Sequence, residues 1–272
     1  MRACEKPIGI FDSGIGGLSV LRWAKQQLPH ENFIYYADRL HAPYGGKDRD
    51  EILALTMDVA AFLMQKDIKA MVVACNTATS ASVDVLRATY DQPIVCMEPA
   101  IRPAFKHLQT AQVSQDAKVL VMATQAMLSN PRMHERLVEV GDEDRCILLP
   151  CPGLVELIER GDFGATAIRD YLQRRLQPYA KEHVDTVVLG CTHYVLIEPL
   201  VRACCQNILH CDTVIHGNGG TARQLERVLQ QGDLLNPSLE PGWIEIHASA
   251  MEQDTIEIAQ RVLACDICAQ AV

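Results

Sequence analysis

The chain has 272 residues, 49% of them hydrophobic, and a formal net charge of −9 at pH 7. This length exceeds the ~100–200 residues typical of one domain, so we expect two domains, and the acidic balance argues against nucleic acid as a direct partner. No apolar run approaches the ~20 residues that span a bilayer, and no secretory signal opens the sequence, so we expect a cytoplasmic protein without a membrane contact.

The first predicted strand, residues 8–11, runs into a glycine-rich turn, Asp-Ser-Gly-Ile-Gly-Gly, at residues 12–17. An amphipathic helix is predicted over residues 18–28. The glycines let backbone N–H groups approach an anion at the helix start. The turn is neither a Walker loop nor a dinucleotide fingerprint, because the required lysine and the glycine spacing are absent, and a plain tight turn explains it equally well.

A second strand is predicted over residues 33–37. The loop at residues 42–47, Ala-Pro-Tyr-Gly-Gly-Lys, is too polar to lie in a core, and loops of this kind often carry function. Asp50 can cap the next helix, whose apolar residues recur at helical spacing.

One sequence pattern occurs twice. Met-Val-Val-Ala-Cys-Asn-Thr at residues 71–77 returns as Val-Val-Leu-Gly-Cys-Thr-His at residues 187–193. Each copy is an apolar run typical of a buried strand, then a cysteine, then polar residues before a helix. Such a cysteine lies where open α/β sheets bind ligands, and the helix dipole favours a thiolate there. A lone cysteine in this place is more often packed than catalytic, but the matched pair, Cys75 and Cys191, indicates function.

Strands and helices alternate through the rest of the chain, with a short strand expected near Ile208. We therefore predict an α/β fold of two pseudo-symmetric, doubly wound domains with parallel sheets and the active site in the cleft between them. The expected domains are residues 1–97 plus 212–272 and residues 98–211. The further expected elements are strands at 93–96, 118–122, 146–149 and 243–247 and helices at 79–90, 154–160, 165–176, 221–231 and 252–264.

The eleven cysteines form an odd count in a chain without an export signal, which indicates free thiols. Cys265 and Cys268 have the spacing of a metal or redox pair, but no second pair accompanies them. A structural role on a terminal helix is therefore predicted, and the same holds for Cys204 and Cys205. We predict no metal site.

Two cysteines that approach one ligand from opposite sides suit inversion at a carbon. One thiolate removes a proton from one face while the other thiol delivers a proton to the opposite face. Asp12 and His193 are natural auxiliaries, and donors for a carboxylate are offered by Asn76, Thr77 and Thr192. Taken singly, these residues are equally well explained as helix caps or, for His193, as a structural histidine.

Four segments resemble the signatures of glutamate racemases: residues 11–17, 43–45, 74–79 and 190–194. They occur in the order of that family, and the resemblance covers essentially the whole chain. It implies a cofactor-independent isomerase that interconverts L- and D-glutamate and supplies D-glutamate for peptidoglycan, and hence for cell wall biogenesis and cell shape. The related aspartate racemases usually have a different first turn, so racemisation of a related acidic amino acid such as aspartate is the alternative.

The resemblance also implies roles for single residues. Cys75, assisted by Asp12, would take the proton from D-glutamate, and Cys191, assisted by His193, would take it from L-glutamate. Glu159, in a looser motif, would be a further acidic residue near Cys191. The substrate would be held by Asp12, Ser13, Tyr44, Gly45, Asn76, Thr77, Thr192 and His193.

Two segments depart from the family pattern. Val195 stands where the family usually has proline, and the run Arg-Leu-His-Ala at residues 39–42 is unusual ahead of Pro-Tyr-Gly. Neither departure removes a residue with a chemical role.

Other readings compete with this one. Acyl transfer by one cysteine with His193 as base leaves the second cysteine idle. Pyridoxal phosphate chemistry lacks a lysine in a recognisable context. A binding protein on the same scaffold would not need catalytic residues in both halves. Some members of the resembled family bind DNA gyrase, and nothing in this sequence argues for or against that contact or a homodimer.

Overall fold

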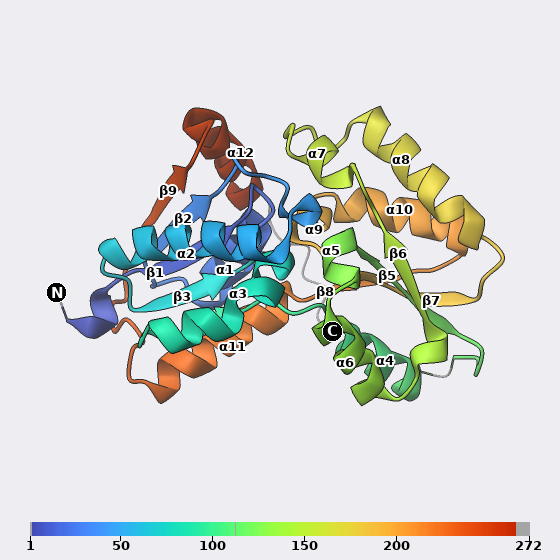
Figure 1. The fold of residues 1–272 in the computed structure, drawn as a ribbon, viewed down its shortest axis with the longest axis horizontal. Coiled ribbons are helices and arrows are strands. Elements are labelled where there is room, and N and C mark those ends of the chain that lie inside the picture. Colours follow the sequence, from blue (N-terminus) through green and yellow to red (C-terminus); the bar gives the residue numbers. More distant parts are fainter. Residues whose placement is uncertain (1, 112, 265–272) are drawn as a thin grey trace. The chain divides into compact units, whose positions relative to one another are not determined.

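The computed structural model describes residues 2–111 and 113–264, which form two compact units (Figure 1). The first unit contains the N-terminal segment as far as Ala42, then Arg49–Met97, and the chain from Asn218 onward. The second contains Pro43–Asp48 and Glu98–Gly217. Cys265 and Cys268, predicted to lie on a terminal helix, are outside the described residues.

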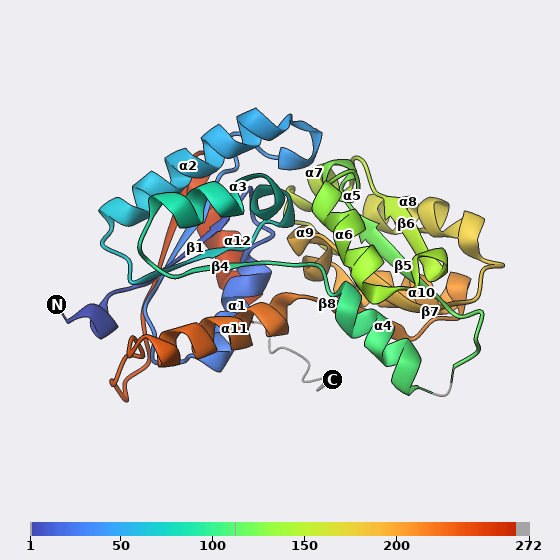
Figure 2. The same cartoon turned by 60° about the horizontal axis from the view of Figure 1, so that its bottom comes forward.

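The first unit is built on a five-stranded parallel sheet of order β4-β3-β1-β2-β9. Figure 2 shows α2 and α3 on one face of this sheet and α1 and α11 on the other. The strands are β1 (Ile8–Asp12), β2 (Phe33–Ala37), β3 (Ala70–Val73), β4 (Ile94–Cys96) and β9 (Ile244–Ala248). The helices are α1 (Leu18–Gln27), α2 (Arg49–Gln65), α3 (Asn76–Thr89), α11 (Asn218–Gln231) and α12 (Glu252–Ala264), with a 3₁₀ turn at Ala3–Glu5.

The second unit is built on a four-stranded parallel sheet of order β6-β5-β7-β8. Alternate residues of β5 enter two apolar clusters, one with α7 to α10 and one with α4 to α6. The strands are β5 (Lys118–Ala123), β6 (Cys146–Pro150), β7 (Val184–Leu189) and β8 (Thr213–His216). The helices are α4 (Ile101–Thr110), α5 (Gln125–Leu128), α6 (Pro131–Val140), α7 (Leu154–Ile158), α8 (Thr166–Leu176), α9 (Thr192–Leu196) and α10 (Glu198–Leu209). Three 3₁₀ turns, Tyr44–Gly46, Glu143–Arg145 and Gln177–Tyr179, complete the unit.

The two sheets share one topology. Read from its other edge, the second sheet runs β8-β7-β5-β6, which matches β4-β3-β1-β2 of the first. The match extends to single backbone hydrogen bonds: Ala74 N donates to Phe11 O, and Gly190 N donates to Met122 O, each at 2.8 Å. The next residue in each case is a cysteine, so the repeat seen in the sequence occupies equivalent positions in the two sheets. The predicted α/β class with parallel sheets is confirmed.

Several details differ from the sequence prediction; for example, α3 and α11 each begin three residues earlier than predicted. The strand expected near Ile208 is wrong, because this residue lies in α10, whose buried residues recur at helical spacing. Short apolar runs do not distinguish a strand from a buried helix. Residues 212–217 include β8, which pairs with β7, and so belong to the second unit rather than the first. Residues 43–48 also group with the second unit.

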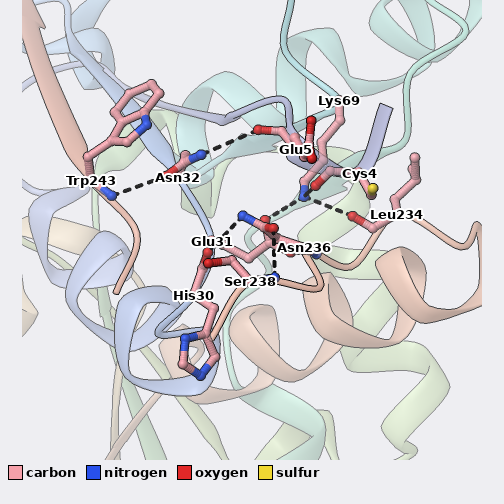
Figure 3. A network of polar contacts seen from close by, with 10 residues as sticks. All are labelled: Cys4, Glu5, His30, Glu31, Asn32, Lys69, Leu234, Asn236, Ser238 and Trp243. Atoms are coloured by element: carbon pink, nitrogen blue, oxygen red, sulfur yellow. Dashed lines mark hydrogen bonds and ion pairs between the residues drawn. The ribbon is translucent and has the colours of Figure 1, made fainter. Parts of the chain in front are cut away.

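A buried ion pair holds the amino-end edge of the first sheet together (Figure 3). Lys69, just ahead of β3, pairs with Glu31, and their side chains are 1% and 3% exposed. The Lys69 ammonium also donates to Cys4 O at 2.6 Å and Leu234 O at 2.8 Å, while Glu31 accepts from Asn236 N at 2.8 Å. A buried charge is tolerated only with such partners. The network therefore ties the returning C-terminal segment to the first unit.

No helix among the described residues is long and apolar enough to cross a membrane.

Candidate active site

The first half of the candidate site forms where β1 ends. Asp12, the last residue of β1, is fully buried, and its Oδ1 accepts a hydrogen bond from Gly14 N at 3.0 Å. A Cβ on Gly17 would lie 2.5 Å from the Cβ of Asp12, so α1 can begin this close to the carboxylate only because residue 17 is glycine. The glycine-rich turn therefore packs closely around Asp12.

Cys75 lies on the adjacent strand, between β3 and α3. It is the N-cap of α3, and its Sγ accepts a hydrogen bond from Ala78 N at 3.4 Å. The thiol also lies 3.5 Å from Ser13 Oγ, to which it donates. Because α3 is 14 residues long, its N-terminal dipole stabilises negative charge on this sulfur. Cys75 is a free thiol, only 6% exposed.

Asn76 and Thr77 form the first turn of α3 directly after Cys75. Both are buried, at 8% and 4% exposure. Asn76 Oδ1 is buried and has no hydrogen-bond partner within the described part of the chain. Buried amide oxygens are nearly always paired, so this oxygen is ready to accept a hydrogen bond from a ligand.

The second half of the site contains a chain of three side chains. Cys191, between β7 and α9, has its Sγ 3.8 Å from His193 Nδ1. His193 Nε2 lies 2.6 Å from Glu159 Oε1, and Glu159 follows the last turn of α7, which packs against α9. The structure therefore groups the three residues that the sequence and the resemblance assigned to this half, while Thr192 begins α9 between Cys191 and His193.

The charge state of His193 follows from these neighbours. Burial lowers the pKa of the imidazole, but the hydrogen bonds to Cys191 and Glu159 outweigh it and raise the pKa well above its usual range. The raised pKa favours the imidazolium form of His193, although the side chain is only 1% exposed. This positive charge stabilises negative charge on the neighbouring sulfur.

Tyr44 and Gly45 belong to the second unit, in the 3₁₀ turn that follows Pro43. Tyr44 is 1% exposed. A Cβ on Gly45 would lie 2.9 Å from the Cβ of Thr124, so this turn approaches the carboxyl end of β5 more closely than a side chain allows. Thr124 Oγ1 accepts from Met127 N at 3.3 Å and caps α5.

Thr124 was not found by sequence reasoning, although it follows β5 as Ser13 follows β1. The second half lacks the glycine-rich turn that singled out the first. The sequence signal that could have identified Thr124 is its place directly after a predicted strand, where a threonine often caps the next helix. Val195 lies within α9, which continues to Leu196. Residues 39–42 form an irregular turn in which His41 N donates to Asp38 O at 3.2 Å.

Other cysteines also lie in the second unit. Burial raises the pKa of Cys146, Cys151 and Cys205 to about 12, so these groups stay protonated thiols. Within residues 2–111 and 113–264, no three His, Cys, Asp or Glu side chains form a group that could hold a metal ion.

Each half-site lies at the carboxyl ends of two neighbouring strands, β1 and β3 in one unit and β5 and β7 in the other. In the first sheet β2 and β3 lie on opposite sides of β1, and in the second β6 and β7 lie on opposite sides of β5. The strand order therefore reverses at β1 and at β5, and open α/β sheets bind ligands at such switch points. The fold and the half-sites define an α/β protein with two similar halves, each of which presents a thiol at its switch point.

Residues 19–223 match the sequence model of the Asp/Glu/Hydantoin racemase family, and the chain belongs to that family. A glutamate racemase from Clostridium perfringens is 41% identical over 94% of this chain and 96% of its own length. The crystal structure of a glutamate racemase isoform from Bacillus anthracis is 29% identical, with a TM-score of 0.79 over 98% of this chain and 97% of that one. The Escherichia coli glutamate racemase in complex with L-glutamate and the activator UDP-MurNAc-ala is 29% identical, with a TM-score of 0.77 and coverage of 94% and 95%.

Proposed function

We propose that this chain interconverts L- and D-glutamate without a cofactor, by a two-base transfer of the Cα proton. The observation that carries the proposal is the equivalent position of two free thiols, Cys75 after β3 and Cys191 after β7. The near full-length similarity to glutamate racemases supports glutamate over aspartate as the substrate.

The chemistry requires the two thiols to act on opposite faces of one carbon. A thiolate on one side removes the Cα proton, and the electron pair left on Cα is delocalised into the α-carboxylate. The thiol on the other side then donates its proton to the opposite face. One C–H bond breaks and another forms, so only the configuration at Cα changes. We propose that the two half-sites enclose one substrate molecule in this way.

The two thiols have different partners. Cys75 is supported by the N-terminus of α3, by Ala78 N and by Ser13, with Asp12 as its assisting carboxylate. Cys191 is supported by the His193 imidazolium, which Glu159 holds in place. We propose that Cys75 is the base for D-glutamate and Cys191 the base for L-glutamate. After one turnover the sulfur that acted as base carries the removed proton and the other sulfur is a thiolate. The His193 imidazolium is placed to return a proton to Cys191.

The substrate carries two carboxylates and an ammonium group. N–H and O–H donors at the starts of α3 and α9 suit a carboxylate, and these are offered by Asn76, Thr77 and Thr192. The ammonium group suits the carboxylate of Asp12 and the Oδ1 of Asn76, which has no hydrogen-bond partner among the residues that the structure describes. Ser13, Tyr44 and Gly45 complete the proposed binding set.

We further propose that the product D-glutamate serves peptidoglycan synthesis in the cytoplasm. The experiment that tests the activity is chiral chromatography of purified protein incubated with L-glutamate and, separately, with L-aspartate. We expect a D-glutamate fraction that approaches one half, with activity unchanged by EDTA or hydroxylamine. Faster racemisation of aspartate would assign the alternative substrate, and loss of activity with hydroxylamine would indicate a carbonyl cofactor and overturn the cofactor-free mechanism.

A further inference from the structure

The run Arg39 to Ala42 connects β2 to the turn that carries Tyr44 and Gly45. The side chain of Arg39 is only 4% exposed. Its Nη1 lies 2.5 Å from Asp254 Oδ2 and donates to Thr255 Oγ1 at 3.1 Å. Both partners belong to the first turn of α12. Because a guanidinium is buried only with partners, these contacts fix where Arg39 lies.

The next two residues are also anchored. Leu40 N donates to Ser249 Oγ at 2.9 Å, and Ser249 N in turn donates to Ala37 O at 3.0 Å. His41 Nδ1 lies 2.8 Å from Oδ1 of the buried Asp38. Three consecutive residues are therefore held by side chains of the first unit. Only Ala42 and Pro43 separate these three residues from Tyr44.

The two segments joined by the Arg39–Asp254 ion pair, α12 and the connecting run, differ in their other packing contacts. α12 buries Thr255, Ile258, Ala259 and Val262, so it stays packed on the first unit without Arg39. The connecting run has no comparable apolar anchor, since Leu40 is 63% exposed. Loss of the contact should therefore loosen the connecting run, which keeps only the polar contacts of Leu40 and His41, and should leave the helix in place.

We propose that Arg39 is a positioning residue. Its ion pair with Asp254 couples α12 to the loop of Tyr44 and Gly45 and so sets the affinity for glutamate. This inference rests on the proposed racemase function. An untethered loop populates its binding conformation for only a fraction of the time, and the apparent dissociation constant rises by the inverse of that fraction.

A purely structural role would look different. If Arg39 only stabilised the packing of α12, its replacement would lower thermal stability and leave KM unchanged. A tether instead raises KM, leaves kcat nearly unchanged, and is restored by lysine, whose ammonium can still pair with Asp254.

The test uses the variants Arg39→Met, Arg39→Lys, Asp254→Asn and the double variant Arg39→Met/Asp254→Asn. Glu257→Gln is the matched control, because it removes one carboxylate from the same helix at an exposed position that contacts Gln253 of α12. The readouts are KM and kcat for L-glutamate, and hydrogen exchange of residues 38–48 by mass spectrometry.

For Arg39→Met we expect KM to rise about 2- to 5-fold, within the range of one partly exposed ion pair. Its kcat should stay within about 2-fold, and residues 38–48 should exchange faster. Asp254→Asn should raise KM by a similar factor, and the KM of the double variant should be no higher than that of Arg39→Met. Arg39→Lys should restore most of the affinity for L-glutamate. Glu257→Gln should match the unaltered protein.

An unchanged KM in Arg39→Met, additive effects in the double variant, or equal effects from Glu257→Gln would each overturn the proposal. If the unaltered protein racemises no acidic amino acid, the proposed function fails separately. Hydrogen exchange of residues 38–48 then tests the coupling without an activity measurement. Unchanged exchange in both Arg39→Met and Asp254→Asn would rule out the coupling.

Discussion

His193 Nε2 lies 2.6 Å from Glu159 Oε1, and both side chains are shielded from solvent, at 2% and 15% exposure. The carboxylate is one of the groups that raise the pKa of His193 against the opposing effect of burial. Glu159 therefore sets the pH range over which the imidazole beside Cys191 stays charged.

Replacement of Glu159 by glutamine should shift the alkaline limb of the pH–activity profile to lower pH. Glutamine keeps an acceptor for Nε2 but removes the negative charge, so the pKa of His193 falls and the imidazolium is lost earlier. The measurement is kcat/KM for both enantiomers across pH. Glu156→Gln, an exposed position on α7, is the control and should leave the profile in place. An unchanged pH dependence of kcat/KM in Glu159→Gln would show that Glu159 does not keep His193 charged.

The same pair makes stability depend on pH. Because the folded state raises the pKa of His193, its contribution to the free energy of unfolding is fully present below the ordinary histidine value of about 6.5. The contribution is lost as pH rises through the higher folded-state value. Thermal melts should therefore show a difference between the unaltered protein and Glu159→Gln that is largest at low pH. A difference that grew with rising pH would contradict this sign.

Much of the fold could be predicted from the sequence because glycines, prolines and polar turn residues mark the ends of many helices and strands. The strand predicted at residues 33–37 and the helix predicted at residues 252–264 coincide with β2 and α12. The region around Ile208 was misread, since its apolar residues serve a buried helix and a strand equally well. An apolar pair as short as Ile208-Leu209, between Asn207 and His210, is too short to show a period by itself.

Site residues within or next to a sequence motif could be predicted from the sequence. Residues that only tertiary packing places in the site were harder to predict. The repeat itself identified Cys75 and Cys191. Glu159 rested on a loose motif, and only the packing of α7 against α9 places it beside His193. The partners of Arg39 come from distant segments without a local pattern, so the sequence carried no signal of these contacts.

Replacement of Lys69 by methionine should destabilise the first unit by about 3–5 kcal/mol, because Glu31 would be left as a buried, unpaired carboxylate. The double variant Lys69→Met/Glu31→Leu should recover part of this loss. Both tryptophans, Trp23 and Trp243, lie in the first unit, so urea unfolding followed by tryptophan fluorescence reports on it.

The control is Lys6→Met, which breaks the more exposed pair with Asp67. Such a pair contributes about 1 kcal/mol or less. Equal unfolding midpoints for the Lys69 and Lys6 variants would show that the buried network does not stabilise the unit.

Adjacent glycines in the Tyr44 loop should respond differently to alanine. A Cβ on Gly45 meets Thr124 at 2.9 Å, whereas a Cβ on Gly46 meets nothing within 4 Å. Gly45→Ala should push the turn away from β5 and raise KM, while Gly46→Ala should behave like the unaltered protein. Overpacking of this kind typically costs about 1–3 kcal/mol, which corresponds to roughly 5- to 150-fold if all of it falls on substrate binding. Equal KM values for both variants would contradict the close approach.

The two-base mechanism makes a prediction that one base cannot satisfy. In deuterated water, the thiol that delivers the new proton exchanges with solvent, so early product should carry deuterium at Cα while recovered substrate stays largely protiated. Cys75→Ala and Cys191→Ala should each abolish racemisation in both directions, because each sulfur is the base one way and the acid the other. Loss of acid–base help costs ~10²–10⁴ in rate, and no second proton source is proposed on the vacated face. Cys146→Ala is the control, since its thiol lies at the start of β6 and stays protonated, with a pKa of about 12. A Cys191→Ala protein that still racemised glutamate within a few-fold of the control would leave the paired-thiol mechanism without support.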